Sequence, residues 1–334
     1  MIETSSKVNL TYHHAQIINF QQESSGVKRG QEVARATSHF SAQIVIFSLI
    51  WSSAFIAGSV AIKDFDPFTL LVLRFALSAL VLLPFGWVGH SLFDAEVVRH
   101  GLMLGLLNNA VYLGLSFSAL RLIRPEVVIV IISSAPFVTT FVATRLGLEP
   151  LSKRIIGGIM LGFVGVLVIS GIATSEPPNI WGLFLATFGM LAFVAGTIIF
   201  RKKSSGLPIL QTNFWQSVAG AVALLPLAAV SGHPIGAPSG QALFALLYLV
   251  FVVTIGGMAL WLLLIRTSGA SSASSYHLLN PFFGVLLAHI VLGEAVRTTD
   301  FIGAVLIGIG LILTTAKRGE NHVRKQPHLG RHVR

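Results

Sequence analysis

Two stretches of the chain carry one pattern: Ser134-Ala135-Pro136-Phe137, running on to Leu146-Gly147-Leu148-Glu149, and Leu279-Asn280-Pro281-Phe282, running on to Val291-Leu292-Gly293-Glu294. In each, a proline inside an apolar run is followed thirteen residues later by a glutamate. A glycine-rich apolar run comes next, in which Gly158 and Gly165 correspond to Gly303 and Gly310 at an offset of 145 residues. A repeat built from apolar segments is typical of membrane transporters.

The composition indicates an integral membrane protein. Of the 334 residues, 54% are hydrophobic and 11% are charged, whereas a soluble domain carries roughly 25% charged residues. About 20 apolar residues cross a bilayer core. Ten continuously apolar runs approach that length: 43–62, 67–88, 101–120, 127–146, 155–173, 181–200, 208–229, 241–265, 271–292 and 299–316. We therefore predict an all-α integral membrane protein with ten transmembrane helices.

The segments outside these runs are polar. Residues 1–40 contain no apolar core of a signal peptide and are predicted to form a disordered cytoplasmic tail. Residues 317–334 form a basic tail, which we also place in the cytoplasm. The chain has no cysteine, which excludes disulfides and thiolate metal sites. We expect neither a metal nor a cofactor.

The placement of basic residues predicts the orientation. A net charge of +10 also occurs in proteins that bind nucleic acid. Here, with the N-terminus inside, 18 of the 23 Lys and Arg residues fall on the cytoplasmic side, four fall in outer loops, and Arg74 lies within a helix. The positive-inside rule then places both termini in the cytoplasm. We expect the partner surface to be the lipid bilayer and not nucleic acid.

The two halves of the chain match in order. Ala54-Phe55-Ile56-Ala57-Gly58 corresponds to Ala192-Phe193-Val194-Ala195-Gly196 at an offset of 138 residues, and Ala79–Pro84 corresponds to Ala221–Pro226 at 142. We predict a first repeat over residues 41–173 and a second over 178–316, each with five helices. Because five is odd, the second repeat enters the membrane from the opposite side. Such inverted repeats are the structural basis of alternating access.

The chain resembles the EamA-type permeases of the drug/metabolite transporter superfamily. The resemblance rests on Ile50-Trp51-Ser52-Ser53-Ala54-Phe55, on Leu73-Arg74-Phe75-Ala76 and on both proline–glutamate units, and it covers about residues 41–316. It implies ten helices, cytoplasmic termini, a prokaryotic inner membrane, and a central cavity lined mainly by the third, fourth, eighth and ninth helices. It also implies export or exchange of small metabolites, often amino acids or drugs. Leu148, which separates Gly147 from Glu149, departs from the adjacent Gly-Glu usual in the family.

Arg74 is the Lys or Arg residue that lies well inside a predicted helix. Intramembrane charge is costly and usually functional. Two interpretations remain open. Arg74 extends along its helix toward Asp64 and Asp66, or it faces the cavity, where it binds an anionic or zwitterionic substrate or closes an outer gate. Its repeat counterpart is Gln216, which we also include among the candidates.

Pro136 and Pro281 each remove a backbone hydrogen bond and bend a helix, which is tolerated best beside a cavity. We assign the polar and aromatic residues of the neighbouring predicted helices to a candidate substrate site: Asn108, Asn109, Tyr112, Ser133, Ser134, Trp261, Tyr276, His277 and Asn280. Each could instead bond to a neighbouring helix. Asn108 and Asn109 point about 100° apart on an α-helix, so we expect one to face the cavity. His277 is the candidate for proton coupling, because histidine titrates near neutral pH.

Glu149 and Glu294 follow the two proline-containing helices. They are interpreted either as loop anchors that support the next helix or as gate ion pairs, Glu149 with Lys153 or Arg154 and Glu294 with Arg297. The glycine-rich runs allow close packing within the chain or between two copies. A homodimer is therefore a further alternative, with an interface formed by Gly157, Gly158, Gly162, Gly165, Gly303, Gly308 and Gly310.

These patterns predict a transporter of a small-molecule substrate. An enzyme would need paired acids, HExxH, GxSxG or a phosphate-binding loop, and the chain contains none of these. All 13 acidic residues fall in loops, tails or helix ends, so no buried carboxylate is expected to relay protons. A membrane channel, or a membrane enzyme without a recognisable motif, is the alternative.

Overall fold

The computed structural model describes residues 42–54, 56–58, 60–87, 92–119, 121–123, 125–170, 178–203, 206–231, 237–292 and 295–315. The chain divides between Phe47 and Ser48 into two units. Residues 42–47, the described part of the first unit, are helical. Everything that follows concerns the second unit. Its described residues contain no β-strand, which confirms the all-helical class predicted from the sequence.

Helical residues 48–54, 56–58 and 60–61 open the second unit. The elements that follow are α2 (Pro67–Leu82), η1 (Pro84–Trp87), α3 (Ala95–Gly105), η2 (Leu106–Tyr112), α4 (Leu113–Ala119), α5 (Pro125–Ser133), α6 (Ala135–Arg145), α7 (Lys153–Ser170), α8 (Ile180–Lys203), α9 (Ile209–Ser231), α10 (Gly240–Tyr248), η3 (Leu249–Gly257), α11 (Met258–Ser268), α12 (Ala270–Tyr276), η4 (His277–Leu279), α13 (Asn280–Leu292) and α14 (Thr298–Thr315).

Local chemistry explains where α2 and α3 begin and end. The Asp66 carboxylate accepts hydrogen bonds from the first turn of α2, and Pro67 is the first residue of the helix, two residue types that favour a helix start. The α-helix stops at Leu82, short of the predicted residue 88, because Pro84 cannot continue it. The next helix begins at residue 95 and not at 101, because the Asp94 side chain caps a polar first turn.

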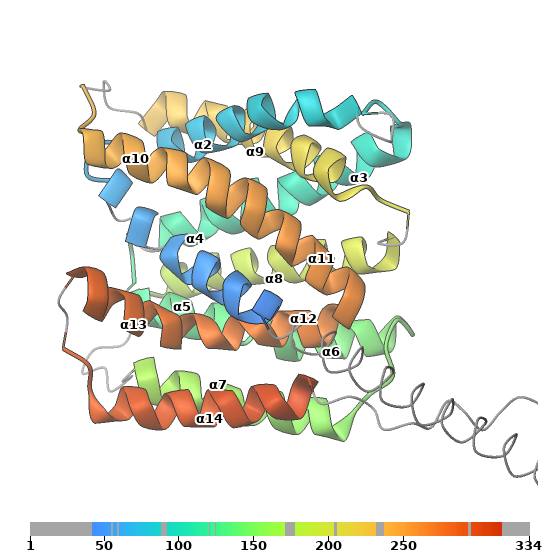
Figure 1. Cartoon of the computed structure of the whole chain (residues 1–334), viewed down its shortest axis with the longest axis vertical. Coiled ribbons are helices and arrows are strands. Elements are labelled where there is room, and N and C mark those ends of the chain that lie inside the picture. Colours follow the sequence, from blue (N-terminus) through green and yellow to red (C-terminus); the bar gives the residue numbers. More distant parts are fainter. Residues whose placement is uncertain are drawn as a thin grey trace, which may run out of the picture. The chain divides into compact units, whose positions relative to one another are not determined.

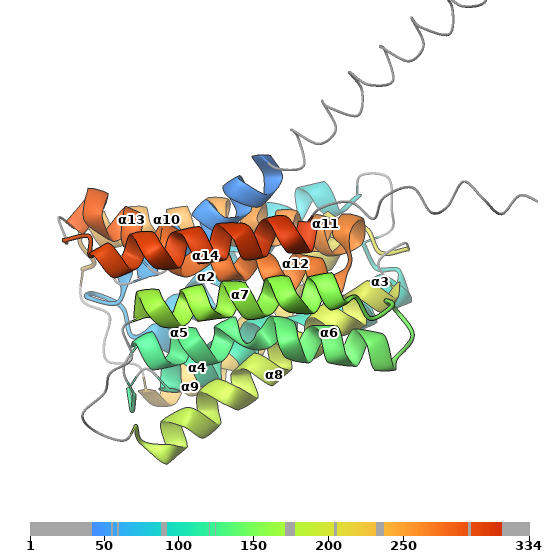
Figure 2. The ribbon, with the colours of Figure 1, turned by 90° about the horizontal axis from the view of Figure 1, so that it is seen from below.

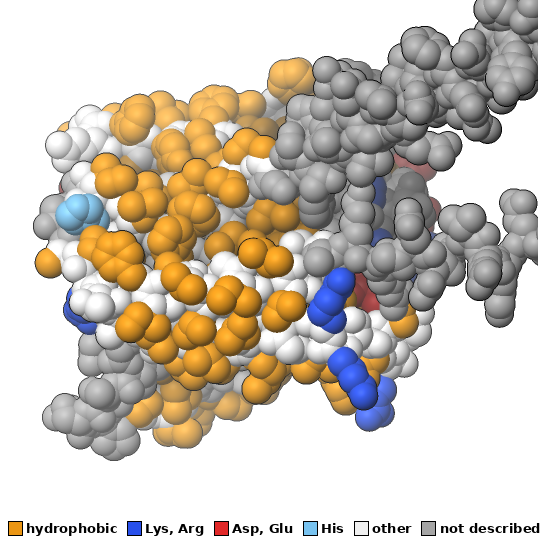
Figure 3. All heavy atoms as spheres, turned by 60° about the horizontal axis from the view of Figure 1, so that its bottom comes forward, with side chains coloured by type: hydrophobic (Ala, Val, Ile, Leu, Met, Phe, Trp, Pro, Cys, Tyr) orange, Lys and Arg blue, Asp and Glu red, His pale blue; other side chains and the backbone are white. Residues whose placement is uncertain are grey.

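Seven helical segments of the described chain are long and apolar enough to cross a membrane: Ala95–Ala119, Val127–Arg145, Lys153–Ser170, Ile180–Lys203, Ile209–Ser231, Gly240–Ser268 and Thr298–Thr315. Helix α2 is apolar but shorter. In the face shown in Figure 3, hydrophobic side chains cover the middle, and Lys and Arg lie toward the ends. This distribution suits a protein surrounded by hydrocarbon at its middle and by water at both ends.

Helices that occupy equivalent places in the two halves pack against each other. Figure 1 shows α7 and α14 side by side along one edge of the view, and α2 with α9 along the opposite edge. Figure 2, seen from below, again shows α7 beside α14. The α2–α9 contact includes Phe75, whose ring lies against Gly220, and Leu71, which packs with Leu224.

Glycines allow α7 and α14 to approach closely. A Cβ atom on Gly158 would lie 2.5 Å from the carbonyl oxygen of Gly310, and one on Gly165 would lie 2.6 Å from that of Gly303. Residue numbers rise along α7 as they fall along α14, so the two helices are antiparallel. The predicted packing role is therefore confirmed for these four glycines, and it is within the chain. Gly157 has open space where its Cβ would be.

Four breaks interrupt the long helical segments. Segments η2 and η3 are π-helical, a widened form with i→i+5 hydrogen bonds that the sequence did not predict. Helix α5 ends at Ser133 and α6 starts at Ala135, while the 3₁₀ turn η4 separates α12 from α13. Pro136 and Pro281 are each the second residue of the helix after the break. There a missing N–H costs nothing, because first-turn N–H groups have no intrahelical partner.

Candidate functional site

An aromatic cluster gathers side chains that are far apart in the sequence. Trp261 of α11 stacks on Phe193 of α8, with ring centroids 5.5 Å apart. His277 of η4 approaches Trp261 edge-on at 4.6 Å and Trp51 of the first helix at 5.1 Å. Tyr112 of η2 joins through Phe193, at 5.0 Å. The predicted candidates Tyr112, Trp261 and His277 are therefore brought together, with Trp51, around Phe193, which the sequence analysis did not select.

Hydrogen bonds from the first helix hold the break between α12 and α13. Ser52 Oγ donates to the carbonyl oxygen of Asn280 at 3.0 Å, and Ser48 Oγ donates to that of Tyr276 at 3.4 Å. The Asn280 side-chain nitrogen lies 3.0 Å from Nδ1 of His277, a contact in which the ring nitrogen accepts. Tyr276 is fully buried. The break in the helix just before Pro281 thus orients His277 toward the aromatic cluster.

The matching break in the first half is built differently. Ser134 Oγ donates back to the carbonyl oxygen of Ile131 at 2.6 Å, and Ser133 is buried. Pro136 is buried at the start of α6. Ser133, Ser134 and Pro136 make no ring contact with the cluster among the described residues. The structure therefore places Ser133, Ser134 and Pro136 at the bend between α5 and α6, without a ring contact to His277 among the described residues.

Arg74 reaches across to the other half of the chain. Its Nε donates to Thr254 Oγ1 of η3 at 2.6 Å, and its guanidinium lies 5.4 Å from the ring centroid of Phe75. Arg74 donates to Thr254, whereas Asp64 and Asp66 bond to Ser239, Arg121 and Ser231, so no contact supports the interpretation that Arg74 extends toward those acids. In the described part of the chain, no acidic group pairs with Arg74. The charge is instead directed at a widened helical turn.

Helix α9 presents a buried polar stripe to both π-helical segments. Asn109 Nδ2 donates to the backbone oxygen of Gln216 at 2.9 Å, and Asn108 Nδ2 donates to its side-chain oxygen at 3.2 Å. Both asparagines are buried against α9. Segment η2 is π-helical, which brings adjacent residues closer to one face than the 100° step of an α-helix does. Asn213 Nδ2 donates to the Thr254 carbonyl of η3 at 2.9 Å.

Among the described residues, four buried polar atoms of this stripe and of the facing η2 have no hydrogen-bond partner: Asn108 Oδ1, Asn213 Oδ1, Gln216 Nε2 and Ser217 Oγ. All four residues are almost completely buried. Because an unsatisfied buried polar group is costly, such groups tend to hold water or ligand. Asn213, Gln216 and Ser217 repeat at helical spacing in an apolar segment, which is a signal readable from the sequence, although only Gln216 is among the predicted candidates.

Glu149 links the end of α6 to two elements of the second half. Gly147, with φ of +68°, ends α6 in a left-handed turn, and Leu148 N donates back to the Ala143 carbonyl at 2.9 Å. The positive φ of this turn explains the glycine at position 147, one residue earlier in the unit than Gly293. The Glu149 carboxylate then accepts from the backbone N–H groups of Ala270 and Ser271, at the start of α12.

The same carboxylate forms an ion pair with Arg201 Nε at the end of α8, at 3.4 Å. This partner differs from the Lys153 or Arg154 considered in the sequence analysis. Arg201 also donates to the carbonyl oxygen of Arg266, which in turn donates to that of Leu207. We call the contact of Glu149 with Arg201 and with the start of α12 the Glu149 junction. It connects α6 with α8 and α12.

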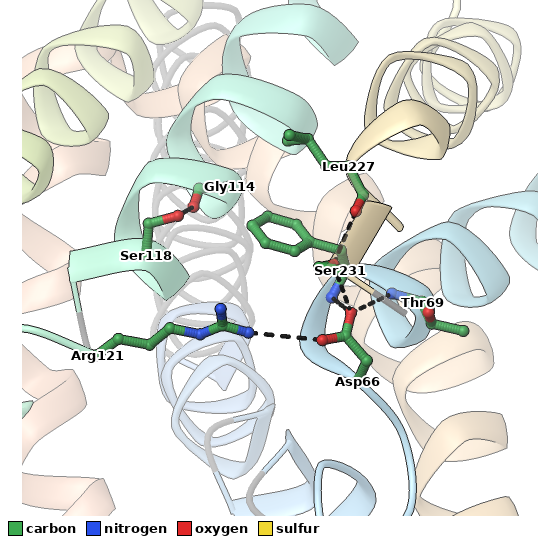
Figure 4. Close-up of polar contacts among 8 residues, drawn as sticks. Asp66, Thr69, Gly114, Ser118, Arg121, Leu227 and Ser231 are labelled. Carbon is green, nitrogen blue, oxygen red and sulfur yellow. Dashed lines mark hydrogen bonds and ion pairs between the residues drawn. The ribbon is translucent and has the colours of Figure 1, made fainter. Parts of the chain in front are cut away.

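The other ends of the helices are joined by Asp66 and Asp64. Figure 4 shows Asp66 capping α2 while it pairs with Arg121, at 3.5 Å, and accepts from Ser231 Oγ at 3.2 Å. Asp64 accepts from the backbone N–H of Ser239 at 2.8 Å. Hydrogen bonds from Ser239 lower the pKa of the Asp64 carboxyl. The remaining gate candidate, Glu294, lies outside the described residues.

No group of three or more metal-ligating side chains lies close together in the part of the chain that the structure describes. The candidate residues can recognise a ligand through aromatic ring faces, hydroxyls and amides, and Arg74 supplies a guanidinium.

A protein-family model described as the EamA-like transporter family matches residues 41–171 and again residues 180–316. Among curated proteins, the uncharacterized inner membrane transporter YedA of Escherichia coli (strain K12) is 24% identical over 271 residues, which cover 80% of this chain and 87% of that protein. An uncharacterized transporter of Archaeoglobus fulgidus is 26% identical over 285 residues, covering 82% of this chain and 96% of the relative.

A solved crystal structure resembles the fold. Its TM-score is 0.71, its sequence identity is 20%, and the match covers 83% of this chain and 96% of the solved chain. At this identity the likeness concerns the fold alone.

Proposed function

Because this chain belongs to the EamA-like transporter family, we propose that it moves a small metabolite, such as an amino acid, across an inner membrane by alternating access. The family and the transporter names of the relatives make it a membrane transporter. The proposal adds ten transmembrane helices in two inverted repeats, with both termini in the cytoplasm. No feature of the described residues favours an enzyme or a channel over this carrier.

The reciprocal packing of α7 and α14 carries the proposal. Gly158 of the first half corresponds to Gly303 of the second, and Gly165 corresponds to Gly310. In the fold, however, Gly158 meets Gly310 and Gly165 meets Gly303. Equivalent helices that run antiparallel and exchange partners in this way are related by a two-fold axis across the helices. That is the relation expected of inverted repeats.

The contacts at the helix ends agree with the proposed topology. Glu149, Arg201 and Ala270 are all expected on the cytoplasmic side, and they meet in the Glu149 junction. Asp66 and Arg121, both expected outside, form an ion pair. The basic excess predicts the same sides from charge alone. We propose that the Glu149 junction closes the cytoplasmic gate.

The substrate site of the proposal is the aromatic cluster with the residues around it: Trp51, Tyr112, Phe193, Trp261, His277 and Asn280. Arg74, Asn108, Asn109 and Gln216 serve in the proposal as polar contacts between the halves. Ser133, Ser134, Pro136, Tyr276 and Pro281 form the bends that place these side chains. A homodimer remains a separate prediction, and the glycines already used between α7 and α14 do not support it.

Counterflow in proteoliposomes tests the function. Vesicles are loaded with an unlabelled amino-acid mixture and given a radiolabelled trace of the same mixture outside. A carrier accumulates label transiently, whereas a channel gives no overshoot and an enzyme gives changed products. A matched variant carries Glu149→Cys and Ala270→Cys, which a bifunctional thiol reagent links across the junction. Linking should stop counterflow, and neither single variant should respond to the reagent. Absence of counterflow with amino acids, nucleosides and organic acids would contradict the proposal.

A further inference from the structure

The π-helical segments η2 and η3 occupy equivalent places in the two halves. Residues 106–112 fall on 251–257 at the repeat offset of 145, inside η3. Each segment separates two differently packed parts of one long helix. Helix α3 packs on α9, whereas α4 packs on α8. Helix α10 clusters with Leu70 of α2, whereas α11 packs on α12. Widened turns between separately packed parts are natural bending points.

Each π-helical segment is held by a polar side chain from the opposite half. Arg74 of α2 donates to Thr254 of η3. Gln216, the counterpart of Arg74 at an offset of 142, accepts from Asn108 and Asn109 of η2. Asn109 and Thr254 are themselves counterparts at 145. Counterpart residues therefore meet in both halves, through the Arg74 side chain at η3, and at η2 through the Gln216 backbone carbonyl, with Asn108 bonded to the Gln216 side chain.

The Arg74 contact acts on the widened turn itself. Thr254 Oγ1, which accepts from Arg74, donates to the carbonyl oxygen of Leu249 five residues earlier, at 2.9 Å. The Thr254 carbonyl accepts from Asn213. The hydroxyl thus connects the guanidinium to the carbonyl at the start of η3. Polar contacts of this kind are retained in membranes, because the alternative is an unsatisfied group in hydrocarbon.

We propose that Arg74 is a positioning residue that holds η3 in its widened form, so that the segment Gly240–Ser268 bends there when the protein changes access. The contact of Gln216 with η2 does the same for Ala95–Ala119. The bending role rests on the proposed transport function, whereas the hold on η3 does not. Arg74 then acts through Thr254 and not by binding substrate.

Hydrogen–deuterium exchange in nanodiscs tests the hold. In Arg74→Gln and Thr254→Val, exchange of the η3 amides should rise about tenfold or more, because each loses a hydrogen bond to a charged group. Thr254→Ser, which keeps the hydroxyl, should restore slow exchange. Thr267→Val is the matched control, since that hydroxyl bonds only to backbone in its own helix. Unchanged exchange in α7 and α14 shows that a variant is folded. If Arg74→Gln does not fold, Arg74→Lys replaces it in the comparison.

The bending role needs a readout at a distance. The chain has no cysteine, and Ala270 is fully buried at the Glu149 junction. Maleimide labelling of Ala270→Cys therefore reports opening of that junction. Arg74→Gln and Thr254→Val should change its rate in the same direction, by about threefold or more, because opening is a population shift. Thr254→Ser and Thr267→Val should leave it unchanged.

The outcomes separate the claims. Unchanged η3 exchange in Arg74→Gln and Thr254→Val overturns the hold. Faster exchange with unchanged labelling shows a static anchor and overturns the bending role. Faster exchange with altered labelling supports both the hold and the bending role. Failed counterflow would contradict the transport proposal and the bending role that rests on it, but not the hold on η3.

Discussion

At the scale of single residues, Glu149 shows how one carboxylate can serve a cap and an ion pair together. Its side chain is 15% exposed and that of Arg201 is 28% exposed, whereas the ion pair of Glu96 with Lys203 is about half exposed on both sides. Solvent screens the second pair far more than the first. The two pairs should therefore contribute unequally to stability.

Glu149→Ala should lower the free energy of unfolding by about 1–3 kcal/mol, because it removes the cap of α12 and a partly buried ion pair. Glu149→Gln should cost less, since its amide oxygen still accepts from the backbone. The measurement is thermal unfolding in detergent. Glu96→Gln is the control and should leave stability nearly unchanged, because solvent screens its exposed ion pair with Lys203. Equal losses for Glu149→Ala and Glu96→Gln would contradict the role of the junction.

Asp64 should add a pH dependence to stability. Its pKa is lowered in the folded protein by hydrogen bonds from Ser239. A carboxyl group with a lowered folded pKa contributes stability above its unfolded pKa, and loses it as pH falls through the folded value. Asp64→Asn should therefore lower the unfolding temperature at pH 7, and the difference from the unmodified chain should shrink as pH falls below the ordinary pKa of an aspartate, about 3.9. A difference in unfolding temperature that grew as pH fell would contradict this prediction.

At the scale of helices, neighbouring glycines in α7 give a paired experiment. Gly158→Ala forces a Cβ against the Gly310 carbonyl, so α7 and α14 must separate, and we expect a loss of about 1–3 kcal/mol. Gly157→Ala meets open space and should be neutral or stabilising by up to about 1 kcal/mol, since alanine favours the helix. Thermal unfolding of both variants in detergent measures the difference. Similar effects at the two positions would contradict the observed packing.

Sequence reasoning reached the helices because their signals are local. Apolar length places the helical segments, Asp66-Pro67 places a capped start, and the repeat at 145 residues pairs Gly158 with Gly303. The π-helical segments η2 and η3 could not be predicted, since no residue pattern marks a π-helical turn. The partners of Arg74 and Glu149 were also missed. Both reach across to the other half, and pairings between distant segments depend on packing that periodicity does not encode.

The candidate site shows the same limit. Tyr112, Trp261 and His277 were selected as polar or aromatic residues in apolar helices, and they do meet. Phe193 was passed over because a phenylalanine in an apolar helix carries no signal of its own. Asn213 and Ser217 could have been found, since they share one helical face with Gln216.

At the scale of the whole molecule, the membrane topology can be tested with single introduced cysteines, because the chain has no cysteine of its own. Ser152→Cys lies just before α7 and Ser239→Cys just before α10, at positions that the charge distribution places on opposite sides. In right-side-out vesicles, a membrane-impermeant maleimide should label Ser239→Cys and spare Ser152→Cys. Labelling should exchange in inside-out vesicles. Equal labelling of both positions in one orientation would contradict the five-helix inversion.

The close packing of α7 with α14 implies that the two halves do not need a covalent connection. The peptide link between α7 and α8 raises the effective concentration of each half for the other. Two polypeptides cut between Ser170 and Ile180, expressed together, should assemble and co-purify through a tag on one of them. Gly158→Val in the first fragment should abolish the capture, whereas Gly157→Ala should not. Two halves that assemble without a covalent link are what a gene fusion of two once separate chains would produce.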